Sequence, residues 1–188
     1  MARADRTLPR WAAWSIGAGL VIAAWFVALA TPGEEQIQAP MPVPVAVGEK
    51  GIGRNLAATV TDVRRTSELH AGDWSAEGNW LVVDVDVAAV TSEDLVSLRH
   101  AEIVVDGVRY GASERPDSLS GQPLSAGVAT RGGLAFELPA DVDSGTAELE
   151  LALSSDRRLD SMIVVEFDLD AVPTAPRDEL PETGWANP

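Results

Sequence analysis

The sequence contains no cysteine, and this absence excludes several kinds of site at once. Disulfides, a lipid anchor carried on cysteine, zinc–thiolate centres and thiol catalysis all need a thiol. Histidine is also scarce, with only His70 and His100 in the chain. Two histidines thirty residues apart make a poor zinc site. We therefore expect no metal and no cofactor, and a folded part that is held together by core packing alone.

Positive charge is scarce as well. The chain has 14 Lys and Arg against 29 Asp and Glu, and thirteen of the 14 are arginine. From Thr31 onward there are 11 basic and 28 acidic residues, a net charge of −17. A surface this acidic repels nucleic-acid phosphates and anionic lipid headgroups. We therefore expect no nucleic-acid partner, and we interpret the acidity as a means of solubility.

Charge of either sign is missing from Trp11–Ala30, a run of twenty residues. A helix rises about 1.5 Å per residue, so this run would span roughly 30 Å, the thickness of the hydrocarbon core of a bilayer. The short leader before it carries Arg3, Arg6 and Arg10 but only Asp5, which favours a cytoplasmic N-terminus. The run thus predicts a single-pass transmembrane helix with the rest of the chain outside the membrane.

A cleavable secretory signal is the alternative. Ala28 and Ala30 stand where the small residues of a signal-peptidase site are found. Against cleavage, the run is longer than the usual apolar core of about 7–15 residues. Tryptophans, which favour the membrane interface, lie near both of its ends: Trp11, Trp14 and Trp25. We favour a retained anchor, and release after Ala30 as a secreted protein stays open.

Proline-rich segments flank the expected folded domain. Prolines 32, 40, 42 and 44 favour an extended spacer after the apolar run, and the C-terminal segment is again proline-rich, as disordered tails are. The expected organisation is a cytoplasmic basic leader (1–10), a transmembrane helix or signal peptide (11–30), a Pro-rich linker (31–48), a β-sandwich (49–170) and a disordered tail (171–188).

Within the domain the apolar residues repeat with period two. In Asn79–Val90, four apolar residues alternate with Asp84 and Asp86, which predicts a strand with one face on a core and one in water. Two further segments alternate in the same way, and two are rich in β-branched and apolar residues: Gly133–Leu138, Thr146–Leu153, Leu56–Arg64 and Ser161–Leu169.

The turns between these segments indicate the architecture. Asp106-Gly107 separates two short apolar segments and predicts a two-residue hairpin. No segment after Ala30 has a helical apolar stripe. About seven short strands, roughly ten residues apart, predict an antiparallel immunoglobulin-like β-sandwich, in which Trp80 is expected to fill part of the core.

Four segments in order strengthen this expectation: Trp80–Val87, Ile103–Tyr110, Leu124–Pro139 and Ile163–Leu169. The series resembles the immunoglobulin-like extracytoplasmic domains of unknown function in actinobacterial and firmicute envelope proteins. These domains are akin to the secreted immunoprotective antigens of mycobacteria. The positions that carry the resemblance are Leu124, Gly127, Gly132 or Gly133, Phe136 and Pro139. It implies a sandwich fold and an envelope location, but no activity and no site residues.

A sortase-like motif occurs near the C-terminus. The sequence reads LPETG, in which the motif positions are Leu180, Pro181, Thr183 and Gly184. Only Trp185 and three further residues follow, whereas a sorting signal needs a hydrophobic stretch and a basic tail. We expect a chance match, with processing by a sortase as the alternative.

Other candidate chemistry is less complete. Asp141-Val-Asp143-Ser-Gly145 begins like a calcium loop, but an EF-hand needs further ligands that are missing here, so a polar turn is expected. His70 is expected in an exposed loop and His100 as a hydrogen-bonded partner beside a strand. No G-x-S-x-G motif surrounds a serine, so we do not expect an enzyme. An envelope hydrolase and a calcium-binding protein remain less favoured alternatives.

The expected function is therefore non-catalytic. We expect a membrane-anchored module outside a Gram-positive cell, which binds an envelope protein that the sequence does not identify. The segments Thr66–Asn79 and Ala112–Ala129 are expected to be long loops, and exposed loops on a rigid scaffold often carry recognition. Within them, Trp74 and Arg115 are the residue types that dominate binding hot spots, so we predict that they contact the partner.

Overall fold

The computed structural model describes residues 9–30, 39–91, 96–155 and 160–186. The chain divides into two units, Met1–Ala39 and Pro40–Pro188, and each is described here by itself. Most of the expected basic leader (residues 1–8) and the first part of the expected linker (31–38) lie outside the described residues.

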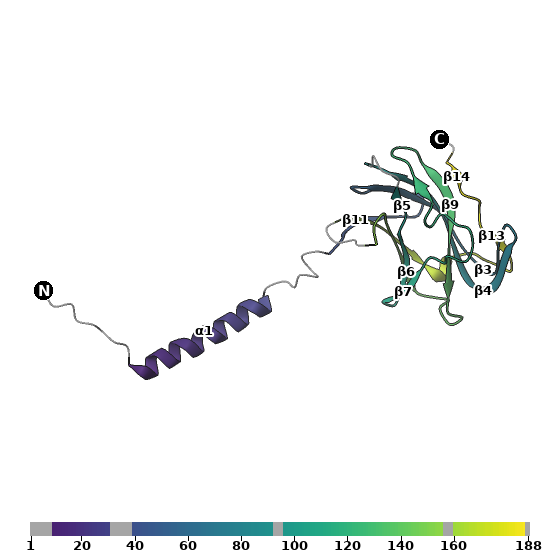
Figure 1. Ribbon diagram of the computed structural model, residues 1–188. Helices are drawn as coiled ribbons and strands as arrows, with labels where there is room; N and C mark the ends of the chain where they lie inside the picture. Colours follow the sequence, from purple (N-terminus) through teal and green to yellow (C-terminus); the bar gives the residue numbers. More distant parts are fainter. Residues whose placement is uncertain (1–8, 31–38, 92–95, 156–159, 187–188) are drawn as a thin grey trace. The chain divides into compact units, whose positions relative to one another are not determined.

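The first unit contains one helix, α1 (Arg10–Ala30), shown in Figure 1. It covers the uncharged run, and its large apolar side chains are exposed, among them Trp14, Leu20 and Phe26. Among the described residues, no helix has both the length and the apolar character needed to cross a membrane.

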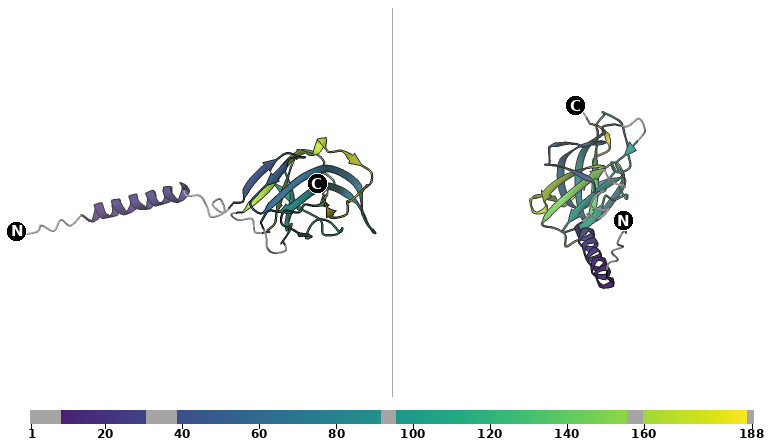
Figure 2. Two further views of the ribbon diagram at one scale, coloured as in Figure 1. Left: turned by 90° about the horizontal axis from the view of Figure 1, so that it is seen from above. Right: turned by 90° about the vertical axis from the view of Figure 1, so that its left-hand side faces the viewer.

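The second unit is built from β-strands arranged in sheets (Figures 1 and 2). The five-stranded sheet has the order β1 (Met41–Val45), β11 (Ser161–Asp168), β10 (Thr146–Ala152), β6 (His100–Val105) and β7 (Val108–Gly111).

The seven-stranded sheet has the order β12 (Thr174–Ala175), β3 (Leu56–Ala71), β4 (Trp74–Ala89), β9 (Thr130–Leu138) and β14 (Gly184–Trp185). Two more strands pair with β3: β2 (Lys50–Ile52) and β13 (Asp178–Glu179). A small third sheet joins β5 (Val96–Ser97) to β8 (Pro123–Leu124), and one 3-10 turn, η1 (Leu169–Ala171), follows β11.

The main core lies between the two large sheets. Because side chains alternate along a strand, every second residue of β4 faces this core, as the sequence predicts for Leu81, Val83, Val85 and Val87. The five-stranded sheet contributes Ile103, Ala147, Leu149, Leu151, Ile163 and Val165. The domain is therefore a β-sandwich, as predicted.

The pairing is not purely antiparallel, and the domain begins earlier than predicted. Met41–Val45, expected in the linker, pairs with β11 in parallel. It forms an edge strand, where proline is tolerated because its missing N–H can face away from the sheet. Pro42 and Pro44 are two residues apart, so both lie on the same side of the strand, which can be its free side. The folded unit thus starts at Pro40 rather than at residue 49.

The predicted hairpin at Asp106-Gly107 is confirmed, whereas one of the predicted long loops is not. The Asp106-Gly107 hairpin joins β6 to β7, and both residues have positive φ (50° and 79°), as the favoured two-residue turn requires. The predicted long loop Thr66–Asn79 is wrong, because β3 and β4 continue into it and pair as far as Ala71 and Trp74. A β-bulge between Thr66 and Glu68 interrupts the period-two pattern, so the sequence does not indicate that the strand continues.

The predicted disordered tail is wrong for the described residues. Residues 173–186, here called the C-terminal strap, pair first with β3 through β12 and β13 and then with β9 through β14. Leu180 N–H donates to the His70 carbonyl (2.8 Å), and Ala186 N–H donates to the Ala129 carbonyl (3.0 Å). Since β4 lies between β3 and β9, the strap crosses the outer face of the seven-stranded sheet.

Beneath the strap lies a second buried cluster, composed of Leu69, Trp80, Val82, Ala135 and Leu180. Trp80 is fully buried, but it belongs to this outer cluster and not to the core between the sheets. Gly133 gives the strap its space, since a Cβ there would lie 2.5 Å from Leu180 Cδ1 and 2.9 Å from Pro181 Cδ. The close approach of the strap therefore requires glycine at this position.

Candidate functional site

A cleft of about 730 Å³ opens where the β3–β4 turn, the segment after β7 and the C-terminal strap meet. Ala71, Gly72, Asp73 and Trp74 line it from the β3–β4 hairpin. Arg115, Asp117, Ser118 and Gln122 line it from the second segment, and Leu180, Glu182 and Thr183 from the strap. Its volume lies within the range typical of ligand pockets, about 300–1,000 Å³.

Trp74 and Arg115, the two predicted contact residues, lie together in this cleft. Trp74 packs edge-on against Trp80, with ring centroids 5.6 Å apart. The Arg115 guanidinium carbon lies 5.5 Å from the Trp74 centroid and 5.7 Å from that of Trp80, which is cation–π distance. Arg115 Nη1 also donates to Glu137 Oε2 at 2.8 Å. Stacking and the ion pair together fix the guanidinium at the rim of the cleft.

The segment that carries Arg115 is less of a free loop than predicted. Ser113 N–H donates to the Ala135 carbonyl (2.7 Å), and Leu119 N–H donates to the Gly133 carbonyl (3.0 Å). Pro116 and Leu119 are buried. The backbone beside Arg115 is therefore tied to β9 on both sides, so the cleft has a fixed wall.

The strap wall is held by arginine–carboxylate pairs. Asp178 accepts a hydrogen bond from Arg64, whose Nη1 also lies 2.8 Å from Asp84 Oδ2. Burial alone would lower the pKa of Arg64, but its bonds to Asp84 and Asp178 outweigh this and raise it. Further along, Arg177 Nε donates to Glu68 Oε2 at 3.0 Å. These contacts join the strap to β3 through side chains as well as backbone.

The Arg177 contact leads to a prediction on pH. Hydrogen bonds from Arg177 first, and from His70 second, lower the pKa of Glu68 below its ordinary value of 4.5. A depressed carboxyl pKa stabilises the folded chain fully above the ordinary value, and the contribution is lost as the pH falls through the folded pKa. In a carboxyl ¹³C NMR titration, Glu68 should titrate below 4.5, and Arg177→Gln should raise its midpoint. An unchanged midpoint would show that the pair does not form in solution.

The strap also contains the sortase-like motif. Leu180 is 3% exposed within the outer cluster, and Gly184 pairs with Arg131 of β9. Pro181 lies against Gly133, and the Thr183 hydroxyl lies near Gly132. The pentapeptide is thus built into the sheet surface and forms part of the cleft, whereas a protease needs an extended, accessible segment. This placement favours the chance match.

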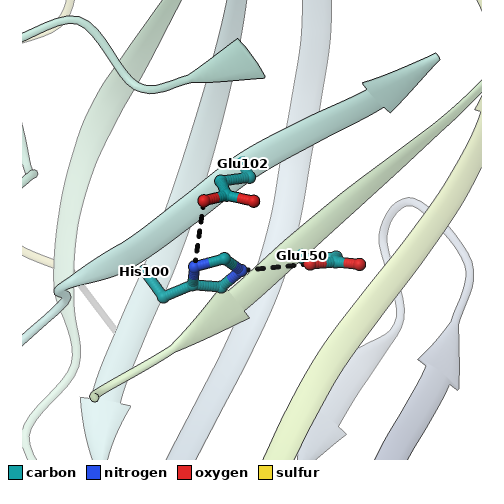
Figure 3. Close-up of side chains that lie close together, drawn as sticks. All are labelled: His100, Glu102 and Glu150. Atoms are coloured by element: carbon teal, nitrogen blue, oxygen red, sulfur yellow. Dashed lines mark hydrogen bonds and ion pairs between the residues drawn. The ribbon is translucent and has the colours of Figure 1, made fainter. Parts of the chain in front are cut away.

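A second cluster of titratable groups lies on the five-stranded sheet (Figure 3). His100 Nε2 lies 3.1 Å from Glu150 Oε2, and His100 Nδ1 lies 3.5 Å from Glu102 Oε1. Glu102 and Glu150 are direct register partners on β6 and β10, which explains why they meet. His100 is thus a hydrogen-bonded partner on a strand, as expected, whereas Glu150 is buried although the alternation predicts that it faces water.

These three residues offer ligand atoms within 4.8 Å of one another, but an arginine already binds the carboxylates. Arg109 Nη2 donates to Glu150 Oε1 at 3.0 Å, Nη1 donates to Oε2, and Nη1 also donates to Glu102 Oε2 at 3.0 Å. The bonds to Glu150 are the main reason why the pKa of Arg109 is raised. A metal ion would have to displace this guanidinium. We therefore interpret the cluster as a structural ion-pair network.

The remaining candidates from the sequence have structural partners. His70 lies on β3 and not in a loop, and its Nε2 is 2.8 Å from Glu68 Oε1. Asp86 is paired with Arg131, so solvation does not account for it. In the calcium-like segment, the Asp143 carbonyl accepts a hydrogen bond from Arg65 Nη1 at 2.8 Å. This bond ties the segment to Arg65 of β3, and the segment forms a turn between β9 and β10, as expected.

Sequence reasoning missed the third wall of the cleft, because the strap resembles a disordered tail in composition. One signal was present. Gly132 and Gly133 are adjacent within a strand, and glycine in a strand often marks the close approach of another backbone.

No protein-family model matches the sequence, and no curated protein matches it. Among solved structures, the chain is similar to an uncharacterised β-sandwich protein from Clostridium difficile 630. The two share 12% sequence identity, with a TM-score of 0.47 over 73% of this chain and 99% of that one.

Proposed function

We propose that this chain is a non-catalytic binding module that contacts another protein of the cell envelope through the cleft. The observation that carries this is the meeting of Trp74 and Arg115 on one concave surface with fixed walls. An aromatic ring, and an arginine already held by stacking and an ion pair, supply contact area at a low cost in conformational entropy, and both residue types dominate binding hot spots.

The lining of the cleft supports a non-catalytic role. The hydroxyl groups of Ser118 and Thr183 line it, but the described lining residues include no histidine to activate them. Nucleophilic catalysis by a hydroxyl needs an adjacent base within hydrogen-bond reach. Ser118 Oγ instead accepts a hydrogen bond from the Ser120 backbone at 3.2 Å.

We also propose that the domain is of the immunoglobulin-like kind and is held outside the cell membrane by Trp11–Ala30. This part rests on the sequence alone, a run of twenty uncharged residues behind a basic leader, whereas no helix of the described residues has the length and apolar character of a membrane span. The alternative, release after Ala30, is favoured by the small residues Ala28 and Ala30. Intact-mass analysis of membrane and medium fractions separates the two, since a mature chain that starts at Thr31 would reject the anchor.

Site-specific photo-crosslinking in the native cells tests the binding function. A photoreactive residue replaces Gln122, which lines the cleft, or Glu166, an exposed residue of β11 on the other sheet. We expect a discrete adduct from position 122 that is absent from position 166 and is lost with Trp74→Leu, which removes the aromatic ring of the cleft but keeps an apolar side chain. The same adducts from both positions, or no effect of Trp74→Leu, would reject the cleft as the contact surface.

A further inference from the structure

The arginines on the outer face of the seven-stranded sheet are already paired with carboxylates of the chain. Each of four arginines there pairs with carboxylates of the same face: Arg64 with Asp84 and Asp178, Arg131 with Asp86, Arg177 with Glu68, and Arg115 with Glu137. The carboxylates in these pairs are therefore neutralised by arginines of the same chain.

Three carboxylates at the rim of the cleft, by contrast, have no arginine partner among the described residues. Asp73 comes from the β3–β4 turn, Asp117 from the segment after β7, and Glu182 from the strap. All three are exposed, and none forms an ion pair with another described residue. Since Arg115 is already neutralised by Glu137, the cleft has a net negative charge and attracts cations.

The spacing of these carboxylates argues against a metal ion. Among the described residues, a group of three metal-type ligands within 4.8 Å occurs at His100, Glu102 and Glu150, and not in the cleft. The three carboxylates are distributed around a cleft of about 730 Å³, which has room for a larger ligand with several positively charged groups.

We propose, building on the binding function above, that the cleft binds a basic, arginine-bearing segment of the partner polypeptide. Trp74 lines the cleft and is only partly buried, so part of its ring faces the cleft, and aromatic rings attract guanidinium groups. Asp73, Asp117 and Glu182 surround this surface and pair with the other cationic groups of the segment. The strong negative charge of the whole chain speeds the approach of such a partner.

Fluorescence anisotropy with the full chain in a zwitterionic detergent tests this proposal. The probe is a short labelled peptide of alternating arginine and glycine, and its counterpart carries glutamate in place of arginine. We expect the arginine peptide to bind at physiological ionic strength and the glutamate peptide not to bind. The cleft variant Asp73→Asn/Asp117→Asn/Glu182→Gln should weaken binding about tenfold or more.

The matched control is Asp106→Asn/Asp141→Asn/Glu166→Gln, which removes the same charge from exposed positions outside the cleft. It should weaken binding by no more than about threefold, because only the diffuse field changes. Equal losses in the two variants, binding of the glutamate peptide, or no binding of the arginine peptide to the natural chain would each overturn the proposal.

The two proposals fail in different ways. If crosslinking from position 122 persists but the arginine peptide does not bind, the partner class is wrong and the cleft remains the contact surface. If the crosslink is also insensitive to Trp74→Leu, both proposals are wrong.

Discussion

Leu180→Ala is expected to lower the free energy of unfolding by about 2–4 kcal/mol, the usual cost of truncating a buried leucine. Leu180 is 3% exposed and packs with Leu69, Trp80, Val82 and Ala135 beneath the strap. Its removal leaves a cavity over Trp80 and takes away the main apolar contact of the strap. Chemical denaturation followed by circular dichroism measures the change.

Trp185→Ala is the matched control, because Trp185 lies in the same strap but is 71% exposed. Its effect should stay within about 0.5 kcal/mol, as for most surface substitutions. If the two variants lost equally little stability, the strap would not be docked on the sheet, and the cleft would lack one wall.

Arg109→Met is expected to destabilise the fold by about 2–3 kcal/mol at neutral pH. The Glu150 side chain is 4% exposed and would lose the guanidinium that binds both of its oxygens. The expected loss is smaller than for a fully buried pair, about 3–5 kcal/mol, because Arg109 itself is 47% exposed and partly screened by water. Adding Glu150→Gln to Arg109→Met should restore part of the loss, since the buried charge is then removed.

Arg99→Met serves as the control, because Arg99 is an exposed arginine next to His100. It should change stability by less than about 0.5 kcal/mol. A melting temperature of the natural chain that rises on addition of zinc would contradict the structural interpretation of the cluster, because a ligand that binds the folded state stabilises it.

The long strands could be predicted from the sequence, because the apolar residues of β4, β9 and β10 that face the main core recur at every second position. The strap could not be predicted in this way. Its strands are two residues long, too short for any period, and their stability comes from the distant sheet surface. Strand β1 could not be predicted either. Its prolines indicate a linker, and only the structure shows that it pairs with the edge of β11.

The candidate site was predicted by residue type alone. Tryptophan and arginine in exposed segments suggest a contact surface, and Trp74 and Arg115 do lie together. Their stacking depends on the register of β3 with β4 and on the bonds that tie the Arg115 segment to β9. The role of Glu182 depends on the path of the strap. Such long-range pairings leave no local pattern in a single sequence.

Hydrogen exchange of the strap amides in the full chain tests most directly whether the C-terminal strap completes the sandwich and forms a wall of the cleft. The two diagnostic amides are those of Leu180 and Ala186, which donate to the carbonyls of His70 and Ala129. Both should be protected, with Leu180 approaching the protection of the β4 amides around Trp80. Exchange of both amides at the rate of an unstructured chain would contradict the strap, the cleft and the binding function built on them.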